Sequence, residues 1–462
     1  MTTPQDPDRR QFFRRFAGEV ARGAAQVVGT IGELRDRSAA EASALLGNDP
    51  EDAPSAGGTA GGAMDAAPWV GSDGHLISEM APRGFRTPFR FGSDDVLLVL
   101  DQRRLPDALV EVRVHDAAEA GEAIRDMIVR GAPAIGQVAA IGIALQARKA
   151  RSAQPRARRA ILLGAAETLR TARPTAVNLG WAVDRMLARF EALGPLSVAG
   201  QTIAEALMAE ALEVVAEASE DHGRMAEAGL ALLPAPAGRP LRILTHCNTG
   251  PLAAGQYGTA LGIVQAAHHA ERPIHVWVDE TRPYLQGARL TTWELAQAGV
   301  PHTLLPDMAA GPLMARGEVD VVLVGGDRVA ANGDTANKLG TYTLAVLAAR
   351  HGIPLYVVVP LTSVDLATPD GAAIPIEERS ADEVSTVRGV RLAPAGTAVH
   401  NPAFDVTPAE LITAIVTDEG VVWPPYSEGL AAAVDRRTAR RAGRAIGPVA
   451  IEPSREPASE GG

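Results

Sequence analysis

A thiol and a carboxylate each follow a short apolar segment of this sequence. Cys247 comes soon after residues 241–245, and Asp327 follows two glycines after residues 319–324. Polar residues also follow three further apolar segments: 274–278, 302–305 and 355–359. If these segments are parallel strands, their carboxyl ends meet at one edge of a sheet, where open α/β sheets bind ligands. A thiolate and a protonated carboxyl facing each other there form an acid–base pair suited to moving a proton on a polyol.

Each of these residues also has a purely structural interpretation. A lone cysteine is commonly a small buried hydrophobe, whereas backbone amides at the start of a turn lower a thiol's pKa and favour the thiolate. Asp327 either caps a following helix or, in an apolar pocket, keeps its proton near neutral pH and acts as a general acid. His246 is either a base for the neighbouring thiol or a hydrogen-bonded core residue. The cluster Glu377-Glu378-Arg379 is interpreted most simply as solvated charge, although it could close over a site.

Three basic positions predict an anion site. Arg130 begins RGAPAIG and Arg173 begins RPTAVNL, each at the start of a predicted helix. Helix N-terminal amides and a guanidinium together bind anions. The alternative interpretation is that each motif is simply a helix start with an exposed arginine. Asn337-Lys338 precedes the helix predicted at 338–351 in the same manner, and Lys338 is one of only two lysines in the chain. The sequence thus predicts a cleft for a small phosphorylated ligand.

Periodicity divides the chain into a helical part and an alternating part. An apolar run at 96–100 predicts a strand, and helical spacing of apolar residues predicts amphipathic helices in 116–150, 156–172, 178–193 and 200–232. The proline-rich stretch 234–240 ends this pattern. Beyond it, strands alternate with helices, which is typical of βαβ units in a parallel sheet covered on both faces.

We therefore expect four regions. An amphipathic helical extension with a flexible linker occupies 1–68, and a mostly helical N-terminal domain occupies 69–237. A parallel-sheet domain follows at 238–446, and a disordered tail at 447–462.

Composition excludes several classes of protein. A net charge of −11 argues against a general nucleic-acid binder, and no apolar run approaches the ~20 residues that span a bilayer. A single cysteine excludes internal disulfides and multi-cysteine metal sites. No metal-ligand spacing is apparent, and the fingerprint G-x-G-x-x-G is missing from the first strand–helix turn. We expect a cytoplasmic protein without a metal or other cofactor.

Seven motifs, in order over about residues 94–445, resemble the methylthioribose-1-phosphate isomerase family. They are RGAPAIG (130–136), RPTAVNL (173–179), THCNTGPLAAGQYGTALG (245–262), DETRPYLQGARLTTWEL (279–295), GGDRVAANGDTANKLGTYTLAVLA (325–348), IPIEERS (374–380) and NPAFDVTPAELITAIVTDEG (401–420). The resemblance implies a smaller, largely helical N-terminal domain, a Rossmann-like C-terminal domain, and a homodimer. It implies isomerisation of 5-methylthioribose 1-phosphate, an aldose, to the ketose 5-methylthioribulose 1-phosphate in methionine salvage.

The resemblance also implies roles for individual residues. Cys247 and Asp327 would be the catalytic pair. The substrate's phosphate and hydroxyls would be held by seven residues: Arg130, Gly131, Ala132, Arg173, Gln286, Asn337 and Lys338. Gln137 and the turn Thr362–Asp365 depart from the family pattern, and residues 1–90 have no counterpart in it.

Three alternatives remain at this point. The substrate could be ribose 1,5-bisphosphate, whose second phosphate needs additional basic residues, or 5-deoxyribose 1-phosphate, which lacks only the methylthio group. The chain could also be a non-catalytic binding module, like the related regulatory subunits of a translation-initiation exchange factor. Such a module would not need Cys247 and Asp327 together.

Overall fold

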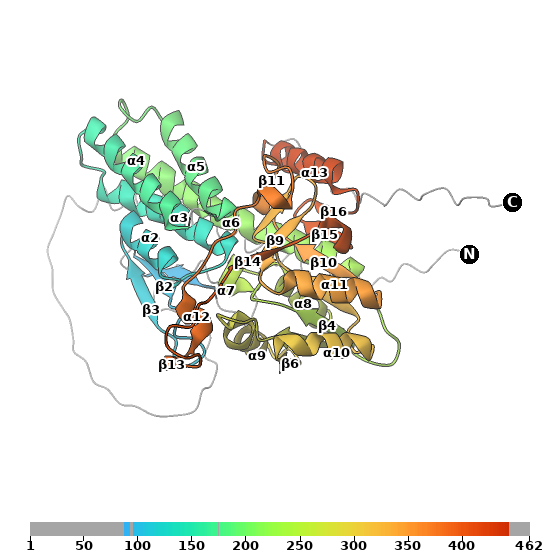
Figure 1. Ribbon diagram of the computed structural model, residues 1–462. Coiled ribbons are helices and arrows are strands. Elements are labelled where there is room, and N and C mark those ends of the chain that lie inside the picture. Colours follow the sequence, from blue (N-terminus) through green and yellow to red (C-terminus); the bar gives the residue numbers. More distant parts are fainter. Residues whose placement is uncertain (1–86, 93–95, 174, 443–462) are drawn as a thin grey trace, which may run out of the picture.

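The fold is mixed α/β, with a bundle of helices beside a largely parallel sheet (Figure 1). The computed structural model describes residues 87–92, 96–173 and 175–442, so the extension and linker expected at 1–68 and the tail at 447–462 lie outside the described residues. Within the described ranges, no helix combines the length and apolarity needed to cross a membrane.

The N-terminal part combines a small antiparallel sheet with long helices. The sheet has the order β1-β2-β3, of which sequence analysis predicted only β2 (Leu97–Leu100). Its other strands are β1 (Phe89–Phe91) and β3 (Glu111–Val114). The helices are α2 (Ala117–Arg125), α3 (Ala132–Lys149), α4 (Pro155–Ala172), α5 (Val177–Ala192) and α6 (Gly200–Leu232). The helices predicted at 156–172, 178–193 and 200–232 are confirmed to within one residue, whereas 116–150 contains two helices separated by the Arg130-Gly131 turn.

Helix α6 belongs to both hydrophobic cores. Its first half, as far as Val215, packs into the core of the N-terminal helices. Its second half, from Met225, packs against one face of the large sheet. The cores therefore divide within a continuous helix, and the domain boundary expected after residue 237 stays a prediction.

The large sheet has the order β16-β15-β10-β7-β4-β5-β6, and only β16 (Gly420–Val422) is antiparallel to its neighbour. Its parallel strands are β4 (Leu241–Thr245), β5 (Ile274–Asp279), β6 (His302–Leu305), β7 (Val321–Val324), β10 (Leu355–Val358) and β15 (Ala414–Thr417). The five predicted strands are thus confirmed, and β15 is an additional one.

Neighbouring side chains along each central strand enter opposite cores, as the two-residue period of a strand requires. Ile243 packs with the end of α6 and with α8 (Ala260–His269), whereas Leu244 packs with the helices on the other face. Those helices are α10 (Ala310–Ala315), α11 (Thr341–His351) and α13 (Tyr426–Arg441). Both faces are therefore covered, as strand–helix alternation predicts.

A second sheet, of order β11-β8-β9-β14, corrects the helix expected at 338–351. Asn337 and Lys338 end strand β9 (Thr335–Lys338), which pairs with β14 (Phe404–Thr407). The remaining strands are β8 (Arg328–Ala330) and β11 (Val364–Asp365). Gly340, with φ of 110°, turns the chain into α11, so the helix begins only at Thr341.

Close backbone contact at Gly131 joins the two parts of the molecule. Gly131 precedes α3 with φ of 100°, and a Cβ at this position would lie 2.2 Å from the Ala253 carbonyl oxygen in α7 (Pro251–Ala254). Only glycine meets both constraints.

We predict that Gly131→Ala lowers the free energy of unfolding by at least about 2 kcal/mol, because it combines backbone strain with overpacking. Gly164→Ala is the matched control, since Gly164 is exposed on α4 and a Cβ there meets nothing within 4 Å. The control should be neutral or stabilising by roughly 0.5–1 kcal/mol. Thermal unfolding of both variants, followed by circular dichroism, checks this; equal melting temperatures would contradict it.

Candidate active site

An open cavity lies at the carboxyl ends of the central strands and contains about 670 Å³ of empty space, part of it open to solvent. Its wall contains the N-terminal turn of α3, the loops after β4 and β7, and the end of β9. All nine residues expected in a site line it: Arg130, Gly131, Ala132, Arg173, Cys247, Gln286, Asp327, Asn337 and Lys338. The fold thus brings together residues spread over more than 200 positions of sequence.

Cys247 is held by backbone hydrogen bonds on both sides. It follows β4 in a left-handed conformation, with φ of 65°. Its N–H donates to Thr281 Oγ1 at 2.8 Å, and its carbonyl accepts from Thr291 Oγ1 at 2.6 Å. These contacts fix the direction of the thiol in a backbone conformation that non-glycine residues rarely adopt.

Asp327 follows β7 and does not cap a helix. Its N–H donates to the Ala336 carbonyl at 2.9 Å, which places it at the base of the β8–β9 hairpin. The capping interpretation of Asp327 is therefore wrong, because a strand and not a helix comes next.

Burial has the largest effect on the pKa of three titratable groups of the cavity: Asp327, Cys247 and Lys338. It raises the pKa of the Asp327 carboxyl above its usual range, although Lys338 and Arg130 oppose the shift. It also raises the pKa of the Cys247 thiol, against the smaller effects of Arg130 and Lys338. The amide effect expected to favour a thiolate is therefore outweighed. Burial likewise lowers the pKa of Lys338.

The cavity contains two kinds of cation. Arg173 pairs with Glu377 at 3.0 Å, and Arg379 pairs with Glu383. Arg130 and Lys338 form no ion pair within the described part of the chain. Arg130 donates to Asn248 Oδ1 at 2.9 Å, and Lys338 donates to the Ala403 carbonyl at 2.6 Å. Both are nearly buried, so their charge is available to a bound anion in a poorly screened environment.

The charged segment Glu377–Arg379 is not simply solvated. Glu377 is half-buried against Arg173, and Arg379 lines the cavity beside Met127. Sequence analysis did not single out Met127 or Phe404, which also line it. Phe404 belongs to the motif NPAFDV, so the sequence did contain a reason to consider it. Its place in the cavity depends on the pairing of β14 with β9, where Phe404 lies opposite Lys338.

His246 is a buried, hydrogen-bonded residue and not a base for Cys247. Its Nδ1 lies 3.0 Å from Asp279 Oδ2, and its Nε2 lies 2.8 Å from the Leu339 carbonyl. Asp307 adds a third potential metal ligand nearby, yet its carboxylate accepts the N–H groups of Thr281 and Arg282. With these atoms already engaged, the cluster fits a structural role, as the core interpretation of His246 predicts.

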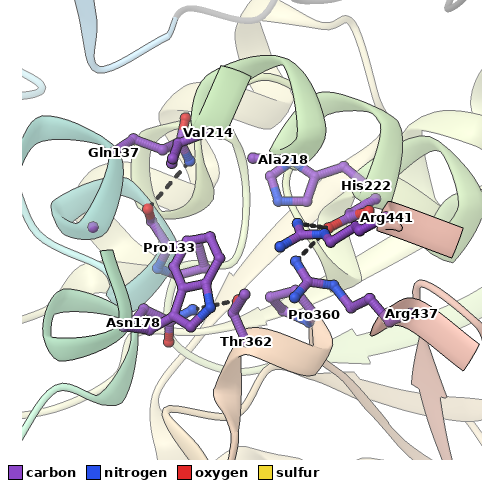
Figure 2. Close-up of a pocket in the computed structure, with 13 residues that line it drawn as sticks. Pro133, Gln137, Asn178, Val214, Ala218, His222, Pro360, Thr362, Arg437 and Arg441 are labelled. Carbon is purple, nitrogen blue, oxygen red and sulfur yellow. Dashed lines mark hydrogen bonds and ion pairs between the residues drawn. The ribbon is translucent and has the colours of Figure 1, made fainter. Parts of the chain in front are cut away.

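A second cavity, of about 360 Å³, shares Pro133 and Pro360 with the first (Figure 2). Gln137 lies in its wall and donates to the Ala254 carbonyl at 2.7 Å, so this departure from the family pattern ties α3 to α7. His222 of α6 points into the same space beside Arg441. Neither ring nitrogen of His222 makes a hydrogen bond of ordinary geometry within the described residues. Burial lowers the pKa of His222 to about 4, and nearby Asp221 opposes this only in part.

We predict that His222 destabilises the fold in mild acid. Because the unfolded histidine has a pKa near 6.5, the unfolded state binds more protons between about pH 6.5 and 4. Stability conferred by the neutral ring is thus lost as pH falls, by about 2 kcal/mol at pH 5. His222→Leu should therefore gain stability relative to the wild type between pH 7 and 5 in urea unfolding. The exposed His351, replaced by leucine, is the control; equal pH dependence of the wild type and His222→Leu would contradict the prediction.

Comparisons with known proteins agree with this architecture. Residues 128–424 match the Initiation factor 2 subunit family. A methylthioribose-1-phosphate isomerase of Anaeromyxobacter sp. (strain Fw109-5) is 53% identical over 357 residues, which cover 77% of this chain and all of that protein. The crystal structure of 5-methylthioribose 1-phosphate isomerase from Pyrococcus horikoshii OT3 superposes with a TM-score of 0.71 at 40% identity, over 78% of this chain and 99% of that one. The translation initiation factor eIF-2B, subunit delta, from A. fulgidus has a TM-score of 0.66 at 37% identity, over 76% and 99%.

Proposed function

The chain belongs to the methylthioribose-1-phosphate isomerases of the Initiation factor 2 subunit family, and we propose that it converts 5-methylthioribose 1-phosphate into 5-methylthioribulose 1-phosphate in methionine salvage. Relatives at about half identity over 93–100% of their length carry this name. A binding module is disfavoured because Cys247 and Asp327 share one cavity with several cations.

One observation carries the choice of substrate: the cavity offers two unpaired cations. Arg130 and Lys338 have no carboxylate partner among the described residues, whereas Arg173 and Arg379 are neutralised by glutamates. Two cations match the charge of one phosphate group. Met127 and Phe404 supply apolar surface in the same cavity. These features favour a monophosphate with an apolar substituent over ribose 1,5-bisphosphate.

Asp327 is proposed to open the sugar ring. The anomeric oxygen of the substrate carries the phosphate, so ordinary hemiacetal reversal cannot open the ring. A protonated carboxyl solves this problem, because it can donate its proton to the ring oxygen. The carboxylate that remains can then take the proton of the 2-hydroxyl as C2 becomes a carbonyl, which regenerates the acid.

Cys247 is proposed to assist the transfer of hydrogen from C2 to C1. Its raised pKa keeps it as the thiol in the free protein, and a thiol is not a base. The arrangement therefore favours direct movement of hydrogen as hydride over removal of a proton by a thiolate. The polarizable sulfur would stabilise this shift in a site from which water is excluded.

The finer features of organisation rest on the family. We infer a helical N-terminal domain, a Rossmann-like C-terminal domain meeting it near residue 237, a homodimer, and a cytoplasmic location. The six parallel strands covered on both faces support the Rossmann-like assignment.

Turnover of 5-methylthioribose 1-phosphate, followed by phosphorus NMR without added metal or nucleotide, tests the proposal. The wild type should form the ketose. Asp327→Asn should lower kcat by at least about 100-fold, because the general acid is lost, and Cys247→Ser should lower it by at least about tenfold. Asp320→Asn is the matched control, since Asp320 precedes the same strand at its opposite end and pairs with Arg239.

Ribose 1,5-bisphosphate and 5-deoxyribose 1-phosphate are assayed alongside. Faster turnover of the bisphosphate would contradict the substrate assignment. Folded wild type inactive on all three sugars would favour the binding module, and an Asp327→Asn enzyme of normal kcat would overturn the assigned acid.

A further inference from the structure

A glutamate outside the cavity is buried behind Arg130. Glu294 of α9 (Thr292–Gln297) is 0% exposed and does not line the cavity. A Cβ at position 250 would lie 2.2 Å from Glu294 Oε2, so the glycine there makes room for the carboxylate. Burying a carboxylate is costly unless its oxygens accept hydrogen bonds, so the partners of Glu294 determine whether it can stay buried as a carboxylate.

Both oxygens of Glu294 accept from groups that can only donate. Oε1 accepts the N–H of Leu252 in α7 at 2.7 Å. Oε2 accepts from Nδ2 of Asn248 at 2.6 Å. Neither a glutamine nor a protonated glutamic acid can replace this pair, because each would turn a donor toward another donor.

The contact with Glu294, together with a longer one to Thr291 Oγ1 at 3.2 Å, fixes the orientation of the Asn248 amide. With Nδ2 held by Glu294, Oδ1 faces Arg130 and accepts from its Nη1 at 2.9 Å. The Asn248 carbonyl accepts from Arg130 Nη2 at 3.2 Å. A flipped amide would turn Nδ2 toward the guanidinium and lose the side-chain contact. Glu294 is the nearer of the two acceptors and the one with a carboxylate, so the orientation of Arg130 depends mainly on Glu294.

We propose that Glu294 is a positioning residue that, through Asn248, aims the Arg130 guanidinium at the phosphate of the substrate. This inference rests on the proposed function for the identity of that phosphate compound. It does not require Glu294 to touch substrate.

Protonation of Glu294 would break the relay, that is, the chain of hydrogen bonds that leads from Leu252 through Glu294 and Asn248 to Arg130. Burial raises the pKa of Glu294 to about 7, opposed by its contacts with Leu252 and Asn248 and by the charge of Arg130. Arg130 is the charged group that faces it, from the turn before α3. As pH falls below about 7, a growing fraction of Glu294 becomes neutral, so KM should rise on the acid side.

The structure also specifies a compensating pair of substitutions. In Glu294→Gln with Asn248→Asp, the glutamine Oε1 accepts from Leu252 and its Nε2 donates to one oxygen of the new carboxylate. The other oxygen of that carboxylate accepts from Arg130. The contacts that link Leu252, position 294, position 248 and Arg130 are replaced at equal total charge, whereas the contact of Asn248 Nδ2 with Thr291 Oγ1 is lost. Asn248→Asp alone instead sets two carboxylates against each other at the 2.6 Å contact.

The test measures KM and kcat for 5-methylthioribose 1-phosphate between pH 6 and 8.5, and binding of inorganic phosphate by calorimetry. Glu294→Gln should raise KM about ten- to 100-fold, the range expected for a charge-assisted hydrogen bond, with a smaller change in kcat and no acid-side rise in KM. The double variant should recover only part of the lost KM, because Arg130 is again held in place while the new carboxylate offsets part of its charge. Asp334→Asn is the control: Asp334 also accepts from an asparagine amide and from backbone N–H groups, but it does not line the cavity.

An unchanged KM in Glu294→Gln, or a double variant no better than the single ones, overturns the relay. A Glu294→Gln protein that merely melts earlier, with normal KM and pH profile, assigns Glu294 a structural role only and also overturns it. Wild type that binds phosphate without turning over the sugar refutes the proposed function. In that case, weaker phosphate binding by Glu294→Gln that is partly restored in the double variant still supports the relay. Wild type with neither turnover nor phosphate binding overturns both.

Discussion

Burial of unpaired charge at the edge of the parallel sheet is the constraint on which the rest of the structure depends. Arg130 and Lys338 are held among neutral partners, opposite one carboxyl and one thiol whose pKa values burial raises. Such a cluster is unfavourable in the empty protein, because water is removed from cations without a full counter-charge. A bound phosphate dianion supplies that counter-charge, so the site is built to be completed by its ligand.

The scaffold meets this cost by fixing several polar neighbours of the cluster. Glu294 and Asn248 hold Arg130, while Thr281 and Thr291 hold the backbone of Cys247 on both sides. Glycines at 131 and 250 allow backbone and carboxylate to approach where any side chain would collide. Because α6 is shared between two hydrophobic cores, the helices that Arg130 and Arg173 flank are anchored to the sheet that positions Cys247 and Asp327. Little rearrangement is then needed on binding, which favours catalysis by a preorganised environment.

Much of this was accessible from sequence, for identifiable reasons. Helices 200–232 and strands 241–245 and 302–305 have a strong period and clear ends, so their bounds were predicted correctly. Strand β9 was not predicted, and the helix expected from residue 338 begins only at Thr341, because Asn337 and Lys338 owe their conformation to pairing with β14, more than 60 residues away. The sequence left Cys247 open between a buried thiol and a thiolate favoured by local amides, since the depth of burial that raises its pKa is a tertiary property. Glu294 lay within a recognised motif, but its role depends on two donors that only the fold brings to it.

The central claim of the proposed mechanism is that the Asp327 carboxyl carries a proton at neutral pH, ready to act as an acid; burial raises its pKa in that direction. An infrared difference spectrum at pH 7 between the wild type and Asp327→Asn measures this directly, because the carbonyl stretch of a protonated carboxyl is distinct from the bands of a carboxylate. We expect the wild type to show one protonated-carboxyl band that the variant lacks, persisting until the pH is raised well above the ordinary range of an aspartate. If the substitution removes only carboxylate bands, and no protonated-carboxyl band is seen at pH 7, then Asp327 is ionised. That result would contradict its role as a general acid.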